Sequence, residues 1–131
     1  MASFQEGKKI SGTFRGDKAS LASPGRISDF LKKLVTDIGM NCLGYHLYDV
    51  PIAIKRHGQE PWHDEGGVTA IAVLTTSHIA IHTWPEDSGA RIDVDSCRDF
   101  DAKVIEGLLL EFFKAHDIKL HDVSSCFLSP V

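Results

Sequence analysis

Apolar residues recur along two stretches of the chain at the three- and four-residue spacing of a helix with one buried face. In the first stretch, which runs from Pro24 to Ile38, they are Ile27, Phe30, Leu31, Leu34, Val35 and Ile38. Ser23 suits the capping position before it, Pro24 the first helical position and Gly39 the stop. The second stripe consists of Phe100, Val104, Ile105, Leu108, Leu109, Phe112 and Phe113. The pattern therefore predicts two amphipathic helices.

Further runs have the apolar pattern typical of β-strands: residues 8–15, 41–50, 67–75, 79–84, 90–97 and 118–128. Residues 53–66 are polar and contain Gly and Pro, which predicts an exposed loop. Two helices with one apolar stripe each can cover only one face of a sheet. We therefore expect a single α+β domain over residues 1–131, a two-layer α/β sandwich whose antiparallel sheet has two helices on one face.

The predicted strand over residues 90–97 indicates which side chains point to the uncovered face. Alternation places Ile92, Val94 and Ser96 on one side, and Arg91, Asp93, Asp95 and Cys97 on the other. The apolar side belongs against the helices, so we expect Cys97 on the open face beside two carboxylates. A free cysteine is more often a small buried hydrophobic residue. The pattern alone leaves that structural role and a functional role equally open.

Composition narrows the function classes. Fourteen Lys and Arg against 18 Asp and Glu give a formal charge of −4 over 131 residues, which argues against a nucleic-acid-binding protein. The longest apolar run, Ala70 to Leu74, is too short to span a membrane, and the N-terminal residues lack the pattern of a secretion signal. Cys42, Cys97 and Cys126 form an odd set without CxxC spacing. We therefore expect reduced thiols and a cytoplasmic protein.

Residues 76–86 read Thr-Ser-His-Ile-Ala-Ile-His-Thr-Trp-Pro-Glu. This segment resembles a hairpin of the small prokaryotic S-adenosylmethionine decarboxylases, which usually reads Glu-Ser-His-Leu-Ser-Ile-His-Thr-Trp-Pro-Glu. The likeness extends upstream to Gly66-Gly67-Val68-Thr69 and downstream to Cys97, which has the same spacing from Ser77 as the family's essential cysteine from its serine. It covers residues 66–113 well, and the N-terminal third only in the order of strand and helix.

The resemblance implies an enzyme that makes its own cofactor. In the family, the serine hydroxyl attacks the preceding carbonyl, and the chain is cut with a pyruvoyl group left on the new N-terminus. Here the cut would fall between Thr76 and Ser77, giving chains of residues 1–76 and 77–131. The pyruvoyl ketone would form a Schiff base with the substrate's amine and accept the electrons released by decarboxylation. Cys97 corresponds to the family's acid, which returns a proton to the α-carbon.

The residue types suit this chemistry, provided that Ser77 and His82 can reach each other. A serine is a poor nucleophile unless it is strained or activated, and the turn between the strands over 67–75 and 79–84 is a place to hold such strain. The imidazole of His82 is the kind of group that moves protons near neutral pH, as ester elimination requires. Ser77 and His82 are five residues apart, roughly 16 Å along a straight strand and on opposite faces. They can cooperate only if Ser77 lies in the turn or the strand is bulged.

The resemblance also implies residues that contact the substrate. Thr69 corresponds to a serine near the family's site, and Glu86 to an acid that contacts substrate. Where the family has a phenylalanine that stacks on adenine, this chain has His63, with Trp62 beside it, so either ring could stack. These correspondences make all four residues candidate substrate contacts.

The hairpin departs from the family's at its first position. Thr76 replaces the usual glutamate, which bears on the efficiency of processing but removes no nucleophile. We expect no metal site, because a zinc pair at His78 and His82 would need a helix. On a strand these two residues lie roughly 13 Å apart, too far for one ion.

A second departure keeps another substrate class open. Asp95 replaces a hydrophobic residue of the family, and a carboxylate there would favour a cationic substrate. We expect S-adenosylmethionine, decarboxylated to supply the aminopropyl donor for spermidine synthesis, with L-ornithine or L-arginine as the alternative on the same scaffold. A third hypothesis is a non-processing relative that acts as a partner or regulatory subunit. For the enzyme we expect a homodimer, because the open sheet face and the resemblance both favour one.

Overall fold

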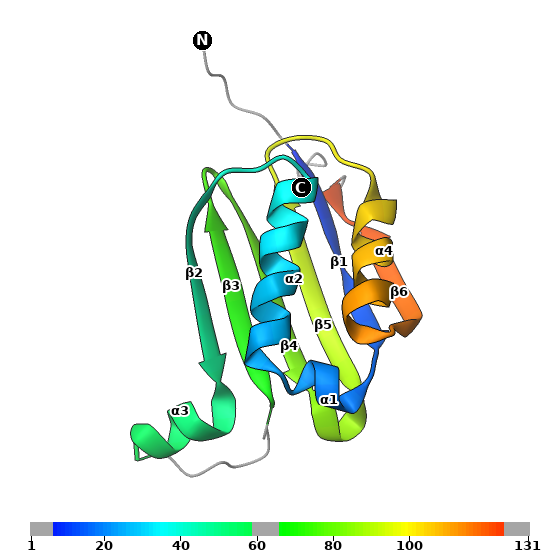
Figure 1. The fold of residues 1–131 in the computed structure, drawn as a ribbon. Helices are drawn as coiled ribbons and strands as arrows, with labels where there is room; N and C mark the ends of the chain where they lie inside the picture. Colours follow the sequence, from blue (N-terminus) through cyan, green and yellow to red (C-terminus); the bar gives the residue numbers. More distant parts are fainter. Residues whose placement is uncertain (1–6, 59–65, 125–131) are drawn as a thin grey trace, which may run out of the picture.

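The computed structural model describes residues 7–58 and 66–124, which form two layers (Figure 1). One layer is a sheet of β1 (Lys8–Arg15), β2 (Cys42–Asp49), β3 (Val68–Leu74), β4 (Ser77–Trp84), β5 (Gly89–Ser96) and β6 (His116–Asp122). The order across the sheet is β2-β3-β4-β5-β1-β6, and every neighbouring pair is antiparallel. The expected α+β sandwich with an antiparallel sheet is thus confirmed.

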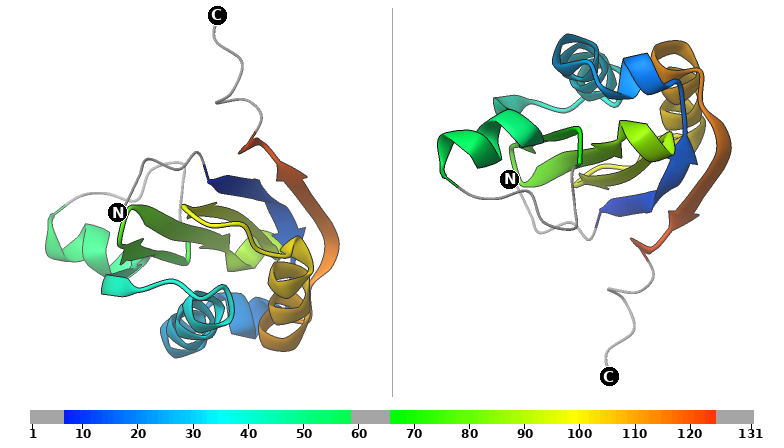
Figure 2. Two further views of the ribbon diagram at one scale, coloured as in Figure 1. Left: turned by 90° about the horizontal axis from the view of Figure 1, so that it is seen from above. Right: turned by 90° about the horizontal axis from the view of Figure 1, so that it is seen from below.

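The second layer consists of helices on one face of the sheet. Helices α2 (Pro24–Asp37) and α4 (Ala102–Phe113) lie side by side there, and the short α1 (Lys18–Leu21) packs at their end (Figure 2). Helix α3 (Val50–Arg56) continues from β2, and a 3₁₀ turn, η1 (Pro85–Asp87), follows β4. Within the described part of the chain, none of these helices has the length and apolar content that a membrane span requires.

The two predicted helices begin and end close to the residues that the sequence pattern indicates, and capping hydrogen bonds fix where they start. Ser23 caps α2, since its hydroxyl oxygen accepts a 3.2 Å hydrogen bond from the Arg26 N–H, and Gly39 follows the helix with φ of +72°. Helix α4 begins after Asp101, whose carboxylate accepts from the Lys103 N–H at 2.9 Å. These caps satisfy backbone donors that a helix leaves without a partner in its first turn.

The loop predicted over residues 53–66 is wrong at its start, because α3 occupies Val50–Arg56. Pro51 suits the first turn of a helix, and apolar residues follow it. The loop prediction rests on the Gly and Pro residues of the segment and overlooks this short apolar stretch. Residues 59–65 lie outside the described residues. The strands agree with their predicted positions, although β4 begins at Ser77 and β6 covers His116–Asp122, with residues 125–128 again outside the description.

The hydrophobic core fills the space between the two layers. Alternate residues of β4 and β5 point into it, and Phe14, Phe30 and Phe113 form a buried aromatic cluster with ring centroids 5.1 and 5.6 Å apart. Aromatic groups of this size contribute much of the apolar area removed from water. The packed layer gives the ends of β4 and β5 a rigid support.

The face of the sheet away from α2 and α4, which we call the open face, carries mostly polar side chains. The pairing of the strands places one row across it that consists of Thr69, His82, Arg91 and Thr13. The next row consists of Ile71, Ala80, Asp93 and Ser11. The open face therefore presents histidine, carboxylate and guanidinium groups on a flat support.

Candidate functional site

A two-residue turn joins β3 to β4 at the predicted cleavage position. Leu74 pairs with Ser77, so Thr75 and Thr76 alone form the turn. Thr76 has φ of +67°, as the second central residue of a type II turn requires, a place usually taken by glycine or asparagine. For a residue with a side chain this left-handed conformation costs about 1–2 kcal/mol. The backbone is therefore strained at the residue whose carbonyl precedes Ser77.

Ser77 and Cys97 meet at the end of the sheet where this turn lies. Ser77 is the first residue of β4, and its side chain is buried on the helix-facing side. Its hydroxyl oxygen accepts a 2.8 Å hydrogen bond from the backbone N–H of Cys97. The contact follows from the register, because the start of β4 lies beside the end of β5, where His78 pairs with Asp95. The structure thus brings together the predicted nucleophile and the predicted acid.

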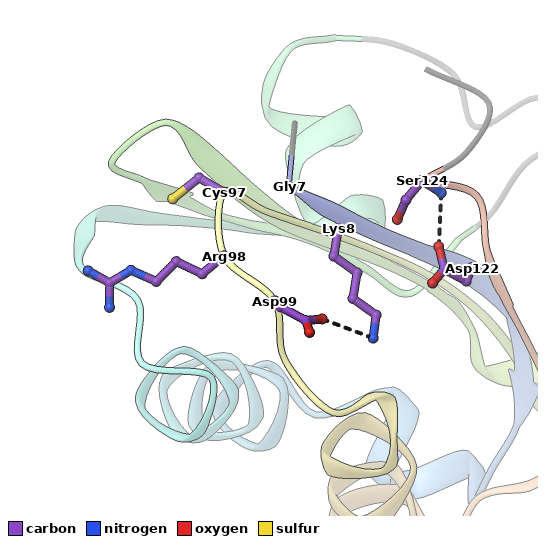
Figure 3. A pocket seen from close by; sticks show the side chains of 7 residues that line it. All are labelled: Gly7, Lys8, Cys97, Arg98, Asp99, Asp122 and Ser124. Atoms are coloured by element: carbon purple, nitrogen blue, oxygen red, sulfur yellow. Dashed lines mark hydrogen bonds and ion pairs between the residues drawn. The ribbon is translucent and has the colours of Figure 1, made fainter. Parts of the chain in front are cut away.

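The surroundings of Cys97 differ from those that alternation predicts. Strand β5 ends at Ser96, so Cys97 no longer follows its two-residue period. Cys97 lines a pocket of about 520 Å³ between the start of β1, the end of β6 and the connection from β5 to α4 (Figure 3). The carboxylates of this pocket are Asp99 and Asp122, and not the predicted pair on β5. Lys8 neutralises part of that charge, with its Nζ 3.4 Å from Asp99.

The pKa of the Cys97 thiol lies below its ordinary value. The main cause is a hydrogen bond with the side chain of Thr76, and burial opposes it by disfavouring the thiolate. The Ser77 hydroxyl and the Arg98 guanidinium lower this pKa further. A lower pKa makes the thiol a stronger acid near neutral pH, which is the property a proton donor needs.

His82 and Thr69 form a second group, on the open face. They pair across β4 and β3, and Thr69 Oγ1 lies 3.1 Å from His82 Nδ1. The pairing of β4 with β3 has no bulge between Ser77 and His82, and Ser77 lies in the strand and not in the turn. The two side chains therefore leave opposite faces, roughly 16 Å apart along the strand. Within one chain the condition for their cooperation is not met.

Asp95 takes part in a charged cluster on the open face. His78 Nε2 lies 3.2 Å from Asp93 Oδ2, and His78 Nδ1 lies 3.8 Å from Asp95 Oδ2. Lys9 Nζ is 3.5 Å from the same Asp93 oxygen. From the sequence, His78 is considered only as a possible metal ligand, and this cluster is not predicted. The cluster depends on the register of β4 against β5, and these strands are joined through η1 and not by the two-residue hairpin, so the sequence offers no turn signal that fixes it.

Of the remaining predicted substrate contacts, the structure describes Glu86, which does not lie beside Ser77. Glu86 lies in η1 beyond the far end of β4, where its exposed carboxylate is 3.2 Å from Lys18 Nζ. Trp62 and His63 lie outside the described residues. Of the predicted site residues that the structure describes, Thr76, Ser77 and Cys97 are the ones that it brings together.

Known proteins similar to this chain agree on one family. Residues 10–125 match the family model described as S-adenosylmethionine decarboxylase. The S-adenosylmethionine decarboxylase proenzyme of Thermomicrobium roseum is 37% identical over 65 residues, which are 49% of this chain and 56% of that protein. The S-adenosylmethionine decarboxylase proenzyme of Pyrobaculum neutrophilum is 57% identical over 35 residues, 27% of this chain and 28% of the relative.

An arginine decarboxylase proenzyme of Caldivirga maquilingensis is 42% identical over 69 residues, 53% of this chain and 47% of the relative. The chain thus spans about half or less of the length of these curated relatives. The crystal structure of the adenosylmethionine decarboxylase from Aquifex aeolicus covers 92% of this chain and 90% of its own, with a TM-score of 0.68 at 22% identity. That likeness shows a shared fold.

Proposed function

We propose that this chain, which belongs to the S-adenosylmethionine decarboxylase family, is a self-processing, pyruvoyl-dependent decarboxylase. The observation that carries the proposal is the contact between Ser77 and Cys97, directly after the strained Thr76. The proposed cut, between Thr76 and Ser77, divides the chain into residues 1–76 and 77–131. The proposed substrate is S-adenosylmethionine, whose decarboxylation would supply the aminopropyl donor for spermidine synthesis.

In the proposed cut, Ser77 Oγ attacks the carbonyl carbon of Thr76, and the bond from this carbon to the Ser77 nitrogen breaks as an ester forms. Loss of the Ser77 α-proton then breaks the Cβ–Oγ bond, so that Oγ leaves with Thr76 as a carboxylate. The resulting enamine takes up a proton at Cβ and becomes an imine, water replaces the imine nitrogen, which departs as ammonia, and a ketone remains at the Ser77 Cα. Strain at Thr76 favours the first step, because cutting the chain releases it. The hydrogen bond from the Cys97 N–H to Oγ favours the second step, the breaking of the Cβ–Oγ bond, because negative charge develops on Oγ as it leaves.

The surroundings of Ser77 fit a pyruvoyl group at that position. His78 would hold the new chain end in the sheet, since it pairs with Val73 on one side and Asp95 on the other. When present, the group supplies an electron sink for the loss of carbon dioxide from an α-amino acid. Cys97 would hold a proton beside the substrate's α-carbon, and its lowered pKa suits donation near neutral pH.

The proposed active unit is a homodimer. Ser77 and His82 point to opposite faces of one sheet, so a second copy would have to bring its own His82 and Thr69 to the end of the sheet where the turn before Ser77 lies. A chain of this size buries only about two thirds of its surface on folding, and pairing of two open faces would bury more. Association would thus both stabilise the chain and complete the site.

The proposed compartment is the cytoplasm. Cys42 and Cys97 are free thiols, and a reducing compartment keeps them so. Oxidation of Cys97 would remove the proposed proton donor.

A basic amino acid, L-arginine or L-ornithine, is the second candidate substrate. One relative is named an arginine decarboxylase proenzyme, and Asp93 and Asp95 give the open face two carboxylates that could meet a cationic substrate. These carboxylates already have His78 and Lys9 as partners, so S-adenosylmethionine stays the first candidate.

Release of carbon dioxide from S-adenosylmethionine, L-arginine and L-ornithine tests the proposal, with the Ser77→Ala chain as the blank. Release from S-adenosylmethionine alone supports the first candidate, and release from arginine or ornithine alone supports the second. No release from any of them by a correctly cut chain would overturn both. A chain that stays uncut and inactive is the result expected of a regulatory partner.

A further inference from the structure

The turn after β5 makes a contact that the proposed chemistry does not use. Ser96, the last residue of β5, has a fully buried side chain. Its hydroxyl oxygen accepts a 3.1 Å hydrogen bond from the backbone N–H of Arg98, and its hydroxyl donates to Met40 Sδ at 3.5 Å. A serine hydroxyl that binds the N–H two residues ahead mimics a backbone turn and bends the chain. The bend therefore falls on Cys97.

A second contact confines the same turn from the side of β1. Gly7 precedes β1 with φ of +71°, and a Cβ on it would stand 2.2 Å from the Ser96 carbonyl oxygen and 3.2 Å from Cys97 Cα. Only a residue without a side chain can approach the peptide so closely. Figure 3 shows Gly7 and Cys97 at the same end of the pocket. The Ser96–Cys97 peptide is thus held from within the core by Ser96 and from outside it by Gly7.

We propose that Ser96 and Gly7 are positioning residues, which hold this turn so that the Cys97 N–H meets Ser77 Oγ and the thiol stays beside Thr76. The inference rests on the proposed roles of Ser77 and Cys97. Two consecutive N–H groups, of Cys97 and Arg98, each bind a serine hydroxyl. Without the Ser96 hydroxyl, the Arg98 N–H must find another partner, and the direction of the neighbouring Cys97 N–H changes with it.

Three substitutions at two serines separate positioning from a general loss of stability. Ser96→Ala removes the hydroxyl, and Ser96→Thr keeps it. Ser20→Ala is the matched control, because Ser20 is also buried, its hydroxyl donates to Asp17 Oδ2 at 2.9 Å, and it lies in α1 at the other end of the sheet. Gly7→Ala reaches the same turn from outside the core, so the test survives if Ser96→Ala does not fold.

Two readouts are measured on each full-length chain. The first is the rate of cleavage before Ser77, followed by denaturing mass spectrometry. The second is the pH dependence of iodoacetamide alkylation, resolved by peptide so that Cys42 serves as an internal reference for Cys97. We expect Ser96→Ala and Gly7→Ala to slow cleavage at least tenfold and to move the Cys97 alkylation profile to higher pH. We expect Ser96→Thr and Ser20→Ala to match the parent in both.

A folded Ser96→Ala or Gly7→Ala chain with the parent's cleavage rate and alkylation profile would overturn the inference. An equal loss in Ser20→Ala would do the same, since the effect would then be one of stability. If the parent is never cut, the proposed function fails. The alkylation profiles need no cleavage, so they would still decide whether Ser96 and Gly7 position Cys97.

Discussion

The backbone N–H of Cys97 donates a 2.8 Å hydrogen bond to Ser77 Oγ, across a sequence separation of 20 residues. The start of β4 and the end of β5 are neighbours because the two strands are antiparallel. A turn lies at each of these two strand ends. Thr76 has a positive φ directly before Ser77, and the Ser96 hydroxyl accepts a hydrogen bond from the Arg98 N–H, which bends the chain at Cys97. The register of two strands and the turns at their ends thus place a nucleophile beside an acid.

Replacement of Ser77 by alanine should abolish cleavage, because the proposed attack on the Thr76 carbonyl uses the Ser77 hydroxyl. Denaturing mass spectrometry should show only the uncut 14.4 kDa chain. Ser20→Ala, in α1 at the other end of the sheet, is the control and should be cut at the parental rate. A fragment that begins at residue 77 in the Ser77→Ala chain would rule out the proposed nucleophile.

Thr76→Gly should stabilise the uncut chain, since glycine adopts φ of +67° without strain. In the Ser77→Ala background we expect a net gain of about 0.5–1 kcal/mol in the free energy of unfolding, the relief of strain less the greater backbone entropy of glycine. Urea unfolding measures it. Thr75→Gly, at the neighbouring position without positive φ, should bring no gain. Equal effects at the two positions would show that Thr76 stores no strain.

Cys97→Ala should leave cleavage intact and cripple turnover. A positioned general acid contributes about 10²–10⁴-fold, so the release of carbon dioxide by the cut chain should fall by that factor. Cys42→Ala is the control, because Cys42 is the other free thiol among the described residues and lies on β2, which β3 separates from β4. Parental turnover in the cut Cys97→Ala chain would remove Cys97 from the role of proton donor.

The lowered pKa of Cys97 sets the sign of a pH dependence. The thiolate is the form that reacts with iodoacetamide, so in the uncut chain Cys97 should be alkylated at a lower pH than an ordinary thiol. The Thr76 hydroxyl is the largest cause of this lowered pKa. In the uncut Ser77→Ala chain, Thr76→Val should therefore raise the pH of half-maximal alkylation of Cys97. An unchanged midpoint would show that another group sets this pKa.

Mixed dimers test whether His82 acts across the proposed interface. Alone, the Ser77→Ala chain should not be cut, and the His82→Ala chain should be cut slowly or not at all. When the two are expressed together, the His82→Ala chain should be cut, because it keeps Ser77 and its partner supplies His82. Mass spectrometry distinguishes the two chains by the substituted residues. Failure of the mixture to restore cleavage would mean that His82 does not act from a second copy.

The sequence predicts the parts of the fold that repeat over many residues. Helix α2 is recognisable because Ser23, Pro24 and a regular apolar stripe agree, and β3 because its apolar residues form an unbroken run. Helix α3 escapes prediction, since its seven residues are fewer than a periodic pattern needs. The layered fold thus follows from the pattern, and the short elements do not.

In the site, too, the sequence predicts some features and misses others, here at the level of single contacts. The motif identifies Ser77 and Cys97, but alternation continues β5 through Cys97, whereas the Ser96 hydroxyl ends the strand one residue earlier. Periodicity tells which face His78 occupies, but its neighbours Asp93 and Asp95 follow only from the register. The positive φ of Thr76 has no signal in a β-branched residue, because such residues avoid that conformation.

The central claim is that the chain cuts itself before Ser77, and the intact mass of the purified protein under denaturing conditions tests it most directly. We predict two species, residues 1–76 and residues 77–131, and the second should have an N-terminus that is blocked to Edman degradation. The Ser77→Ala chain should yield neither species. A single parental species of 14.4 kDa that persists on long incubation would contradict the claim.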